Sequence, residues 1–395
     1  MVRAVRVSNF KSLKSCSIEM SPLTLLVGRN GAGKSNVVDI LRFVKEGLTQ
    51  TLDAAVASRG GVKDVWPRQH SGRPPKLSIG IDLVPTPLTT AEYEIVLRRT
   101  GDGRFDIDRE SLKVVDHSRS RSVDLGGSFE YQRLKKKITS TVDLLPTPSP
   151  DRLQLVGFSG HEVFRPTYDA LTNCGFYSVS PVLIREFQPP ASGELLRRDG
   201  SNLASAIRLL SQRSPETVAR ITQYLETVVP GITAFRHREA GRQETVEFDQ
   251  RSEHEGKPWT FDAYSMSDGT LRTLANLVAM FQLTPDGRPV RLAALDEPET
   301  ALHPAAAAPL FDAITEASQK TQVVVSTHDP ILLDLYRAED ERQRLLVVES
   351  QQGATTVSEP DEAMRDAIRN HLVSAGEMLR QDLFGNPVVD IGAGQ

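Results

Sequence analysis

Residues Gly28–Ser35 read GRNGAGKS, and this stretch decides how the rest of the chain is interpreted. It fits the pattern GxxxxGK[ST] in full. A short apolar run, Leu23–Val27, precedes it, and the following NVVDILRFVKEGL has the apolar spacing of an amphipathic helix. A strand, a glycine loop and a helix in this order form a loop whose backbone N–H groups cradle phosphate oxygens. The sequence therefore predicts a nucleotide phosphate site here.

Each residue type in this loop has a chemical task. Lys34 would place an ammonium group against the β- and γ-phosphates, and the Ser35 hydroxyl would bind Mg²⁺. A glycine turn in a protein that binds no nucleotide is the alternative, and the flanking strand and helix argue against it. The nucleotide-binding set predicted from the sequence is Asn30, Gly31, Ala32, Gly33, Lys34, Ser35 and Asn36.

A pair of carboxylates forms the second signal, in the segment RLAALDEPETALHP. The apolar run Leu292–Leu295 ends in Asp296 and Glu297, and Pro298 then stops the strand. Asp296 is expected to hold Mg²⁺ and Glu297 to orient or deprotonate an attacking water. An exposed acidic pair at a turn would be the simpler interpretation if the phosphate loop were absent.

These motifs together resemble those of ABC-type ATPases, in particular the OLD, RecF and stand-alone SMC-like group. DEPE followed by a His-Pro turn resembles the Walker B motif and D-loop, and VVVSTHDP resembles the H-loop with His328 as the switch histidine. YSMSDGTLR resembles the signature motif, although Asp268 stands where the family has glycine and Thr270 where it usually has glutamine. The resemblance covers roughly residues 1–50 and 175–335.

The resemblance implies an α/β fold: an ABC-type P-loop ATPase core with an antiparallel β lobe and a helical signature lobe. His328 would contact the γ-phosphate, and Gln188 is the candidate for the Q-loop glutamine, with an ordinary loop glutamine equally compatible. Signature residues of one subunit would close over the ATP of the other, so a homodimer with two ATP and Mg²⁺ is implied. The signature set is Ser267, Asp268 and Gly269, for which a helix N-cap turn is the alternative.

Three ranges are expected along the chain. Residues 1–175 would form an N-terminal ATPase lobe that includes an antiparallel β subdomain, with a connector or short insertion near 119–175. Residues 176–275 would form the helical signature lobe, and 276–395 the C-terminal ATPase lobe with a helical tail. Alternating segments such as KLSIGIDL and AEYEIVLRRT predict the antiparallel sheet.

Composition narrows the class of protein. The net charge of −4 excludes a polycation, so any nucleic-acid contact would need a local basic patch. Cys16 and Cys174 have no metal-like spacing and predict neither a zinc site nor a disulfide scaffold, so a reducing cytoplasm is expected. No stretch reaches the ~18–20 apolar residues of a membrane span, and membrane insertion is not expected.

The favoured hypothesis is a DNA-responsive switch ATPase that works with a separate nuclease-type effector in phage defence or DNA maintenance. Its basic stretches are Arg119–Arg121, Arg133–Lys137 and Arg197–Arg198, each of which could instead be a solvated face. The 67 residues after His328 (395 minus 328) lack an acidic metal-ligand cluster, so no TOPRIM-type nuclease is expected there. A nucleotide-gated scaffold with little hydrolysis is the first alternative, and an energising subunit of a membrane transporter the second.

Overall fold

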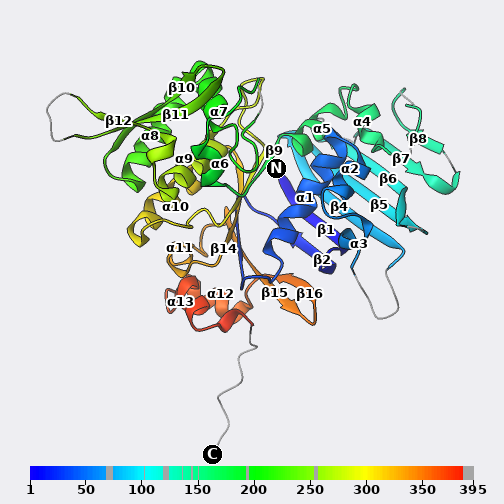
Figure 1. Ribbon diagram of the computed structural model, residues 1–395. Helices are drawn as coiled ribbons and strands as arrows, with labels where there is room; N and C mark the ends of the chain where they lie inside the picture. The colour runs from blue at the N-terminus through cyan, green and yellow to red at the C-terminus, as the bar shows by residue number, and fades with distance from the viewer. Residues whose placement is uncertain are drawn as a thin grey trace, which may run out of the picture. The chain divides into compact units, whose positions relative to one another are not determined.

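The computed structural model (Figure 1) describes residues 1–67, 74–101, 103–118, 124–135, 137–143, 146–149, 151–192, 195–252 and 257–385. The chain divides into two compact units, each made of separate stretches of the sequence. Unit 1 is Met1–Ser21, Arg29–Cys174 and Val348–Ser358, and unit 2 is Pro22–Gly28, Gly175–Val347 and Glu359–Gln395. The expected lobe 176–275 falls within unit 2, and the expected lobe 276–395 does so except for Val348–Ser358, which belongs to unit 1.

Unit 1 is built on an antiparallel run of strands in the order β8-β7-β6-β5-β4-β1-β2, with β16 beside β2. The predicted alternating segments KLSIGIDL and AEYEIVLRRT are confirmed as parts of β4 and β5. The strands are β1 (Val2–Phe10), β2 (Leu13–Glu19), β4 (Lys76–Thr86), β5 (Thr89–Thr100), β6 (Arg104–Asp116), β7 (Asp124–Gln132), β8 (Lys137–Ser140) and β16 (Ala354–Ser358).

The strands β7 and β8 lie in the region where the sequence pattern suggested loop and connector. The segment DLGGSFEYQ has a weak strand signal because it contains two glycines, which lower β-propensity. Packing explains one of them, since a Cβ on Gly127 would lie 2.9 Å from a Val163 methyl group. Pairing with β6 therefore makes a strand of a segment whose own preference is low.

The helices in the described part of unit 1 are α1 (Lys34–Thr49), α2 (Leu52–Ala57), α3 (Val62–Val65), α4 (Gln154–Phe158) and α5 (Arg165–Thr172). The first of them is the helix predicted after the glycine loop. Its buried side includes Ile40, Phe43 and Val44, and the Phe43 ring lies 5.5 Å from that of Phe10 on β1. Burial of this apolar face holds α1 against the strands of unit 1.

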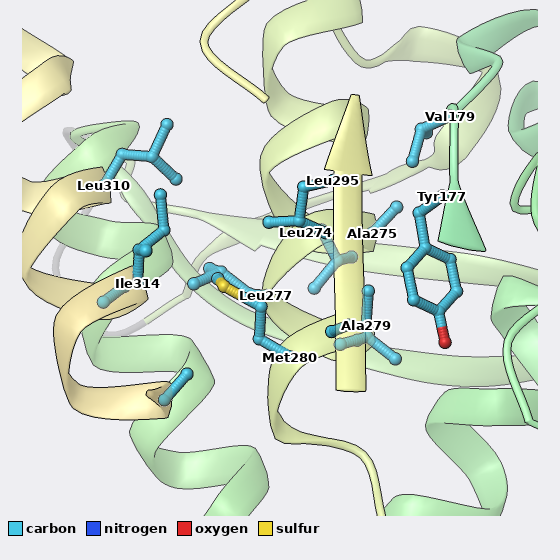
Figure 2. Close-up of a cluster of buried hydrophobic side chains, with 14 of the residues drawn as sticks. Tyr177, Val179, Leu274, Ala275, Leu277, Ala279, Met280, Leu295, Leu310 and Ile314 are labelled. Atoms are coloured by element: carbon cyan, nitrogen blue, oxygen red, sulfur yellow. The ribbon is translucent and has the colours of Figure 1, made fainter. Parts of the chain in front are cut away.

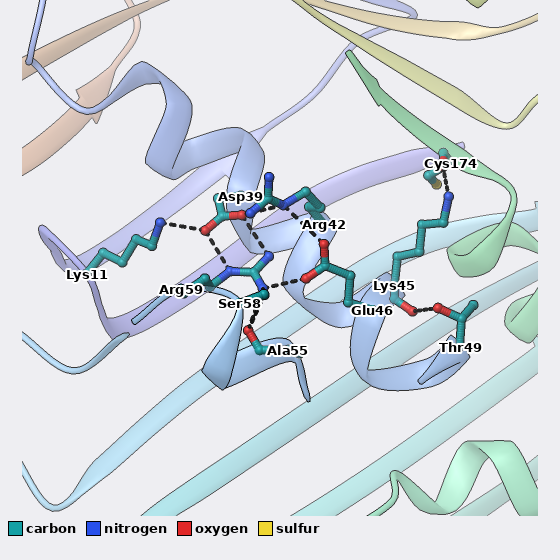
Figure 3. Close-up of polar contacts among 10 residues, drawn as sticks. All are labelled: Lys11, Asp39, Arg42, Lys45, Glu46, Thr49, Ala55, Ser58, Arg59 and Cys174. Atoms are coloured by element: carbon teal, nitrogen blue, oxygen red, sulfur yellow. Dashed lines mark hydrogen bonds and ion pairs between the residues drawn. The ribbon is translucent and has the colours of Figure 1, made fainter. Parts of the chain in front are cut away.

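A charged cluster fixes the polar side of α1 (Figure 3). Asp39 is 5% exposed. Its carboxylate oxygens accept two hydrogen bonds from the Arg59 guanidinium at 2.8 and 2.7 Å, and they form ion pairs with Arg42 Nε at 2.8 Å and Lys11 Nζ at 2.7 Å. Burial alone would raise the pKa of Asp39, but the hydrogen bonds and charge of Arg59, then Lys11 and Arg42, hold that pKa below its usual value. Arg59 also reaches Glu46, so the cluster joins α1 to the turn after α2.

Unit 2 contains a second run of strands in the order β15-β3-β14-β13-β9. β3 pairs in parallel with both β14 and β15, and β14 pairs in parallel with β13. A separate antiparallel sheet, β10-β11-β12, contains a hairpin that turns at Gly241. The strands are β3 (Leu23–Val27), β9 (Cys174–Tyr177), β10 (Ile232–Ala240), β11 (Gln243–Gln250), β12 (Trp259–Asp262), β13 (Leu292–Asp296), β14 (Gln322–Thr327) and β15 (Gln343–Gln351).

The helices of unit 2 bury an apolar core around α9 (Figure 2). Leu277 and Met280 of α9 lie toward Leu310 and Ile314 of α10, with Leu295 of β13 close by. No helix in the part of the chain that the structure describes is long and apolar enough to cross a membrane. The helices are α6 (Pro181–Arg185), α7 (Leu203–Arg213), α8 (Pro215–Val228), α9 (Asp268–Phe281), α10 (Ala307–Ala317), α11 (Pro330–Leu333), α12 (Glu362–Arg369) and α13 (Ala375–Arg380).

A buried carboxylate ties β6 to the start of α4 in unit 1. Glu110 is 0% exposed and accepts hydrogen bonds from the Gln154 and Leu155 N–H groups at 2.5 and 2.9 Å, and from the Tyr93 hydroxyl at 2.8 Å. It thereby satisfies N–H groups that a helix leaves without partners at its N-terminus. Burial raises the pKa of Glu110 to about 7, and these hydrogen bonds oppose the shift.

This burial predicts a pH-dependent stability. A carboxyl whose pKa is higher in the folded than in the unfolded chain makes the folded state lose stability as pH rises from about 4.5 to about 7. The Glu110→Gln variant lacks this titration, so the wild type should lose up to about 3 kcal/mol relative to it across that range. Urea unfolding at pH 4.5, 5.5 and 7 measures the difference. Glu92→Gln, at an exposed position of β5, is the control, and an equal shift there would contradict the explanation by burial.

Candidate functional site

The glycine loop has the backbone geometry of an anion site. Gly31 and Gly33 have φ values of 79° and 108°, which residues with a Cβ rarely adopt. No side chain caps the N-terminus of α1, and its first turn has no acidic residue, so the positive end of this 16-residue helix is left for an anion. Lys34 is 6% exposed and its Nζ lies 3.4 Å from the Arg29 carbonyl oxygen, while Ser35 is exposed.

Three neighbouring parallel strands of unit 2 end at one edge. Val27 of β3 is paired with Thr327 of β14, and Ser326 of β14 with Asp296 of β13. The residues that follow or end these strands are therefore delivered to the same edge: Gly28, where the glycine loop begins, then His328 and Asp296. Ligand sites of open α/β sheets form at this carboxyl edge.

Asp296 is held by two hydroxyl groups. Ser326 Oγ donates to its Oδ1 at 2.6 Å, and Ser178 Oγ to its Oδ2 at 3.4 Å. Ser178 directly follows β9, the strand next to β13 in the sheet order. The two serines orient the Asp296 carboxylate, and carboxylate oxygens are suitable ligands for a divalent cation.

Glu297 and His328 contact each other directly. His328 Nδ1 lies 2.9 Å from Glu297 Oε1, and both side chains are partly exposed. This contact places the Nδ1 side of the imidazole against the carboxylate. Glu297 has a φ of 46°, and its N–H donates to the Ser326 carbonyl at 2.9 Å, so strand β14 holds the residue in this strained conformation.

The segment after the carboxylates is tied to the histidine loop. Thr327 Oγ1 donates to Glu299 Oε1 at 2.5 Å, and Glu299 is 7% exposed. Burial raises the pKa of Glu299, against the hydrogen bond from Thr327. Its second oxygen, Oε2, has no hydrogen-bond partner among the described residues.

The predicted signature residues begin α9. Ser267 is its N-cap: the hydroxyl accepts from the Thr270 N–H at 3.2 Å, while the residue itself stays exposed. Asp268 forms an ion pair with Arg185, whose guanidinium also donates to the Met266 carbonyl at 2.9 Å. A Cβ on residue 269 would lie 2.5 Å from the Ala301 carbonyl oxygen, so Gly269 lets α9 pack on the segment after the carboxylates.

Gln188 has a different environment from the other predicted residues. It is 2% exposed; its Oε1 accepts from the Ala204 N–H at 3.1 Å, and its Nε2 lies 3.4 Å from the carbonyls of Leu183 and Gly200. Both ends of the amide are therefore used to hold the surrounding backbone. The structure does not join this glutamine to Asp296, whose carboxylate is contacted by Ser178 and Ser326.

Sequence reasoning overlooked the supporting polar residues. Ser178, Ser326 and Thr327 lie at or just after the ends of β9 and β14. Their position in the sequence could have identified them, because polar residues at the carboxyl ends of parallel strands lie together at one edge of the sheet. Arg185 had no comparable signal, since its partner Asp268 is 83 residues away.

Comparison with known families gives two matches. A family described as an AAA ATPase domain matches residues 1–213, and one described as an AAA domain, putative AbiEii toxin of a Type IV TA system, matches residues 181–334. Among curated proteins, the chain is similar to an OLD nuclease of Thermus scotoductus, with 24% identity over 400 residues that cover 95% of this chain and 68% of that protein.

Two solved structures share the fold. One is an SmcHead bound to the C-winged helix domain of ScpA, with 16% identity, a TM-score of 0.55, and coverage of 92% of this chain and 99% of that one. The other is an Smc head domain with an extended coiled coil bound to the C-terminal domain of ScpA, derived from Pyrococcus furiosus, with 14% identity, a TM-score of 0.52, and coverage of 94% and 99%. They confirm the predicted α/β fold.

Proposed function

The chain belongs to the AAA ATPase domain family, in its SMC-, RecF- and OLD-like group, and from this we propose that it binds ATP with Mg²⁺ and hydrolyses it. The observation that carries the proposal is the contact between Glu297 and His328, directly after Asp296 at the carboxyl edge of the unit 2 strands. An acidic residue poised by a histidine beside a second carboxylate suits the activation of water.

Binding is assigned to the glycine loop. Gly31, Gly33 and the uncapped start of α1 would surround the phosphates, and Lys34 would neutralise their charge. Ser35 and Asp296 would hold Mg²⁺, whose role when bound is to offset the phosphate charge. Ser178 and Ser326 would fix the orientation of Asp296.

The hydrolytic step is assigned to Glu297. Its carboxylate would take a proton from, or orient, the attacking water, and His328 would hold it in place through Nδ1. Ser178 is proposed in the position expected for the Q-loop glutamine, because its hydroxyl touches Asp296 whereas the Gln188 amide is used within unit 2.

Two substitutions separate binding from hydrolysis. Lys34→Ala should weaken ATP binding about 10- to 150-fold, which is the affinity change expected when one charge-assisted hydrogen bond is lost. Glu297→Gln should retain binding and slow turnover by ~10²–10⁴-fold, the usual contribution of a general base. Calorimetric titration and steady-state phosphate release measure the two effects.

The matched controls are Lys14→Ala and Glu341→Gln, both at exposed positions outside the site, which should behave as wild type. Unchanged ATP affinity in Lys34→Ala would remove the phosphate-loop assignment. Turnover at the wild-type rate in Glu297→Gln would remove its catalytic role. A wild type that binds ATP yet releases no phosphate would favour the alternative of a nucleotide-gated scaffold, with Asp268 and Thr270 as the departures from the family motif.

We also propose an ATP-dependent homodimer with two composite sites. The support is the resemblance of the Ser267–Gly269 turn to the ABC signature, together with the exposed positions of Ser267 and Asp268 at the start of a 14-residue helix. A serine hydroxyl and a helix N-terminus are both favourable next to a γ-phosphate. One chain has one phosphate loop and one such turn, so a two-fold pair of chains completes two sites.

Mixed dimers test the shared site. Ser267→Arg should leave ATP binding to one chain intact but block closure and most hydrolysis, because a large cation replaces the bridging hydroxyl. A mixture of Lys34→Ala and Ser267→Arg chains retains one intact composite site and should recover part of the activity, measured by phosphate release. Loss of the N-cap costs about 1 kcal/mol, so thermal unfolding is measured in parallel. Full activity of Ser267→Arg alone would contradict the composite site.

The biological role proposed is a DNA-responsive switch in phage defence or DNA maintenance that acts with a separate nuclease-type effector. The similarity to an OLD nuclease supports this class of role. Of the basic stretches, Arg197 and Arg198 are exposed, Arg133 is paired with Asp106, and residues 119–121 lie outside the described part of the chain. Lys135 and Lys137 of the second stretch are also exposed, and we take the adjacent pair Arg197 and Arg198 as the candidate for phosphate contact.

DNA retention should depend on ATP, on salt and on this pair. Glu297→Gln with ATP should bind duplex DNA at low salt, and Arg197→Ala/Arg198→Ala should reduce the slope of log affinity against log salt by up to ~1.8 per chain, about 0.9 for each phosphate contact. Filter binding at several salt concentrations measures this, and size-exclusion chromatography with a candidate nuclease tests the effector. No retention at the lowest salt would leave these arginines as a solvated face.

A further inference from the structure

A chain of hydrogen bonds joins the glycine loop to β16, near the C-terminal end of unit 1. Thr355 Oγ1 donates to the Ala32 carbonyl oxygen at 2.9 Å, across 323 positions of sequence. Ser12 Oγ lies 2.7 Å from Thr355 Oγ1, and Asn36 Nδ2 donates to Ser12 Oγ at 2.7 Å. The backbone adds the Thr355 N–H, which donates to the Ser12 carbonyl at 2.8 Å.

The direction of these bonds is fixed by the protons available. A carbonyl oxygen only accepts, so the single hydroxyl proton of Thr355 goes to Ala32. Ser12 must then donate its proton to Thr355, and its own oxygen is left to accept from the Asn36 amide. Each of the two hydroxyl groups thus donates one hydrogen bond and accepts another, and Thr355, at 3% exposure, is shielded from competing water.

This arrangement sets the orientation of one peptide group in the loop. In a trans peptide the C=O and the next N–H point in opposite directions. With the Ala32 carbonyl directed at Thr355, the Gly33 N–H is directed away from β16. The glycine is required as well, because its φ is 108° and a Cβ there would lie 2.2 Å from Thr355 Oγ1.

We propose that Thr355 is a positioning residue for the phosphate loop: its hydroxyl holds the Ala32 peptide so that the Gly33 N–H is presented for the phosphate of a bound nucleoside triphosphate. Ser12 and Asn36 complete the same device, which gives Asn36 a role behind the loop instead of at the nucleotide. The inference rests on the proposed ATP binding.

Calorimetric titration with MgATP tests it in three variants. Thr355→Val keeps the shape and removes the hydroxyl, and should weaken ATP affinity about tenfold, equivalent to about 1.4 kcal/mol. Thr355→Ser keeps the hydroxyl and should bind within about twofold of wild type, which a loss of packing alone would not allow. Thr356→Val, at the adjacent exposed position of β16, is the control and should bind as wild type.

The steady-state readout separates positioning from catalysis. Thr355→Val should raise KM about tenfold with little change in kcat, because Glu297 and His328 are untouched. Ser12→Ala breaks the same chain at its next link and should weaken binding, and the double variant should lose less than the sum of the two single losses. Ser12→Ala also carries the test if Thr355→Val fails to fold, as judged by thermal unfolding without nucleotide.

The possible results separate this inference from the proposed function. If the wild type fails to bind ATP, as the Lys34→Ala variant is expected to do, the proposed function is overturned. A wild type that binds ATP, with Thr355→Val and Ser12→Ala binding equally well, would overturn the positioning role and leave ATP binding in place. Weak binding in Thr355→Val that Thr355→Ser fails to restore would likewise assign Thr355 to packing alone.

Discussion

The pairing of β3 between β14 and β15 is the constraint on which the candidate chemistry depends. All five residues of β3 are buried, and the strand makes parallel ladders on both sides. Parallel strands place their carboxyl ends together, so the segments after β3, β14 and β13 leave from one edge. The glycine loop, the histidine loop and the two carboxylates each begin there because their strands are in register, not because they are close in sequence.

Strain is concentrated in the segment that follows β13. Glu297 and Ala301 have φ values of 46° and 67°, conformations that cost non-glycine residues on the order of 1 kcal/mol or more. The surrounding contacts offset this cost: Ser326 binds the Glu297 backbone, Thr327 binds Glu299, and Gly269 packs on the Ala301 carbonyl. The same contacts link the loop that contains His328 to the start of α9 within unit 2.

Charge and hydroxyl groups hold α1 from two sides within unit 1. The Asp39 cluster acts in the middle of the helix, where three cations compensate one buried carboxylate. The hydroxyls of Ser12 and Thr355 act at its N-terminal end. Buried polar groups of this kind stabilise a structure only when all their partners are present, so they specify one position for the helix. An anion site built from backbone N–H groups needs that rigidity.

The sequence by itself singled out the glycine loop and the carboxylate pair as candidate site residues, predicted the strands and the helix that flank them, and indicated the family. These features are local: a glycine pattern, an apolar period and a strand-end carboxylate can be recognised within about 20 residues. Only the tertiary structure decided that β7 is a strand and that Thr355 hydrogen-bonds to the Ala32 carbonyl. It also decided that Ser178 contacts Asp296, whereas the Gln188 side chain is buried and hydrogen-bonded to backbone groups. The physical reason is that each of these contacts depends on a partner tens to hundreds of residues away in the sequence. A single hydroxyl or glycine residue has no sequence periodicity from which its partner could be predicted.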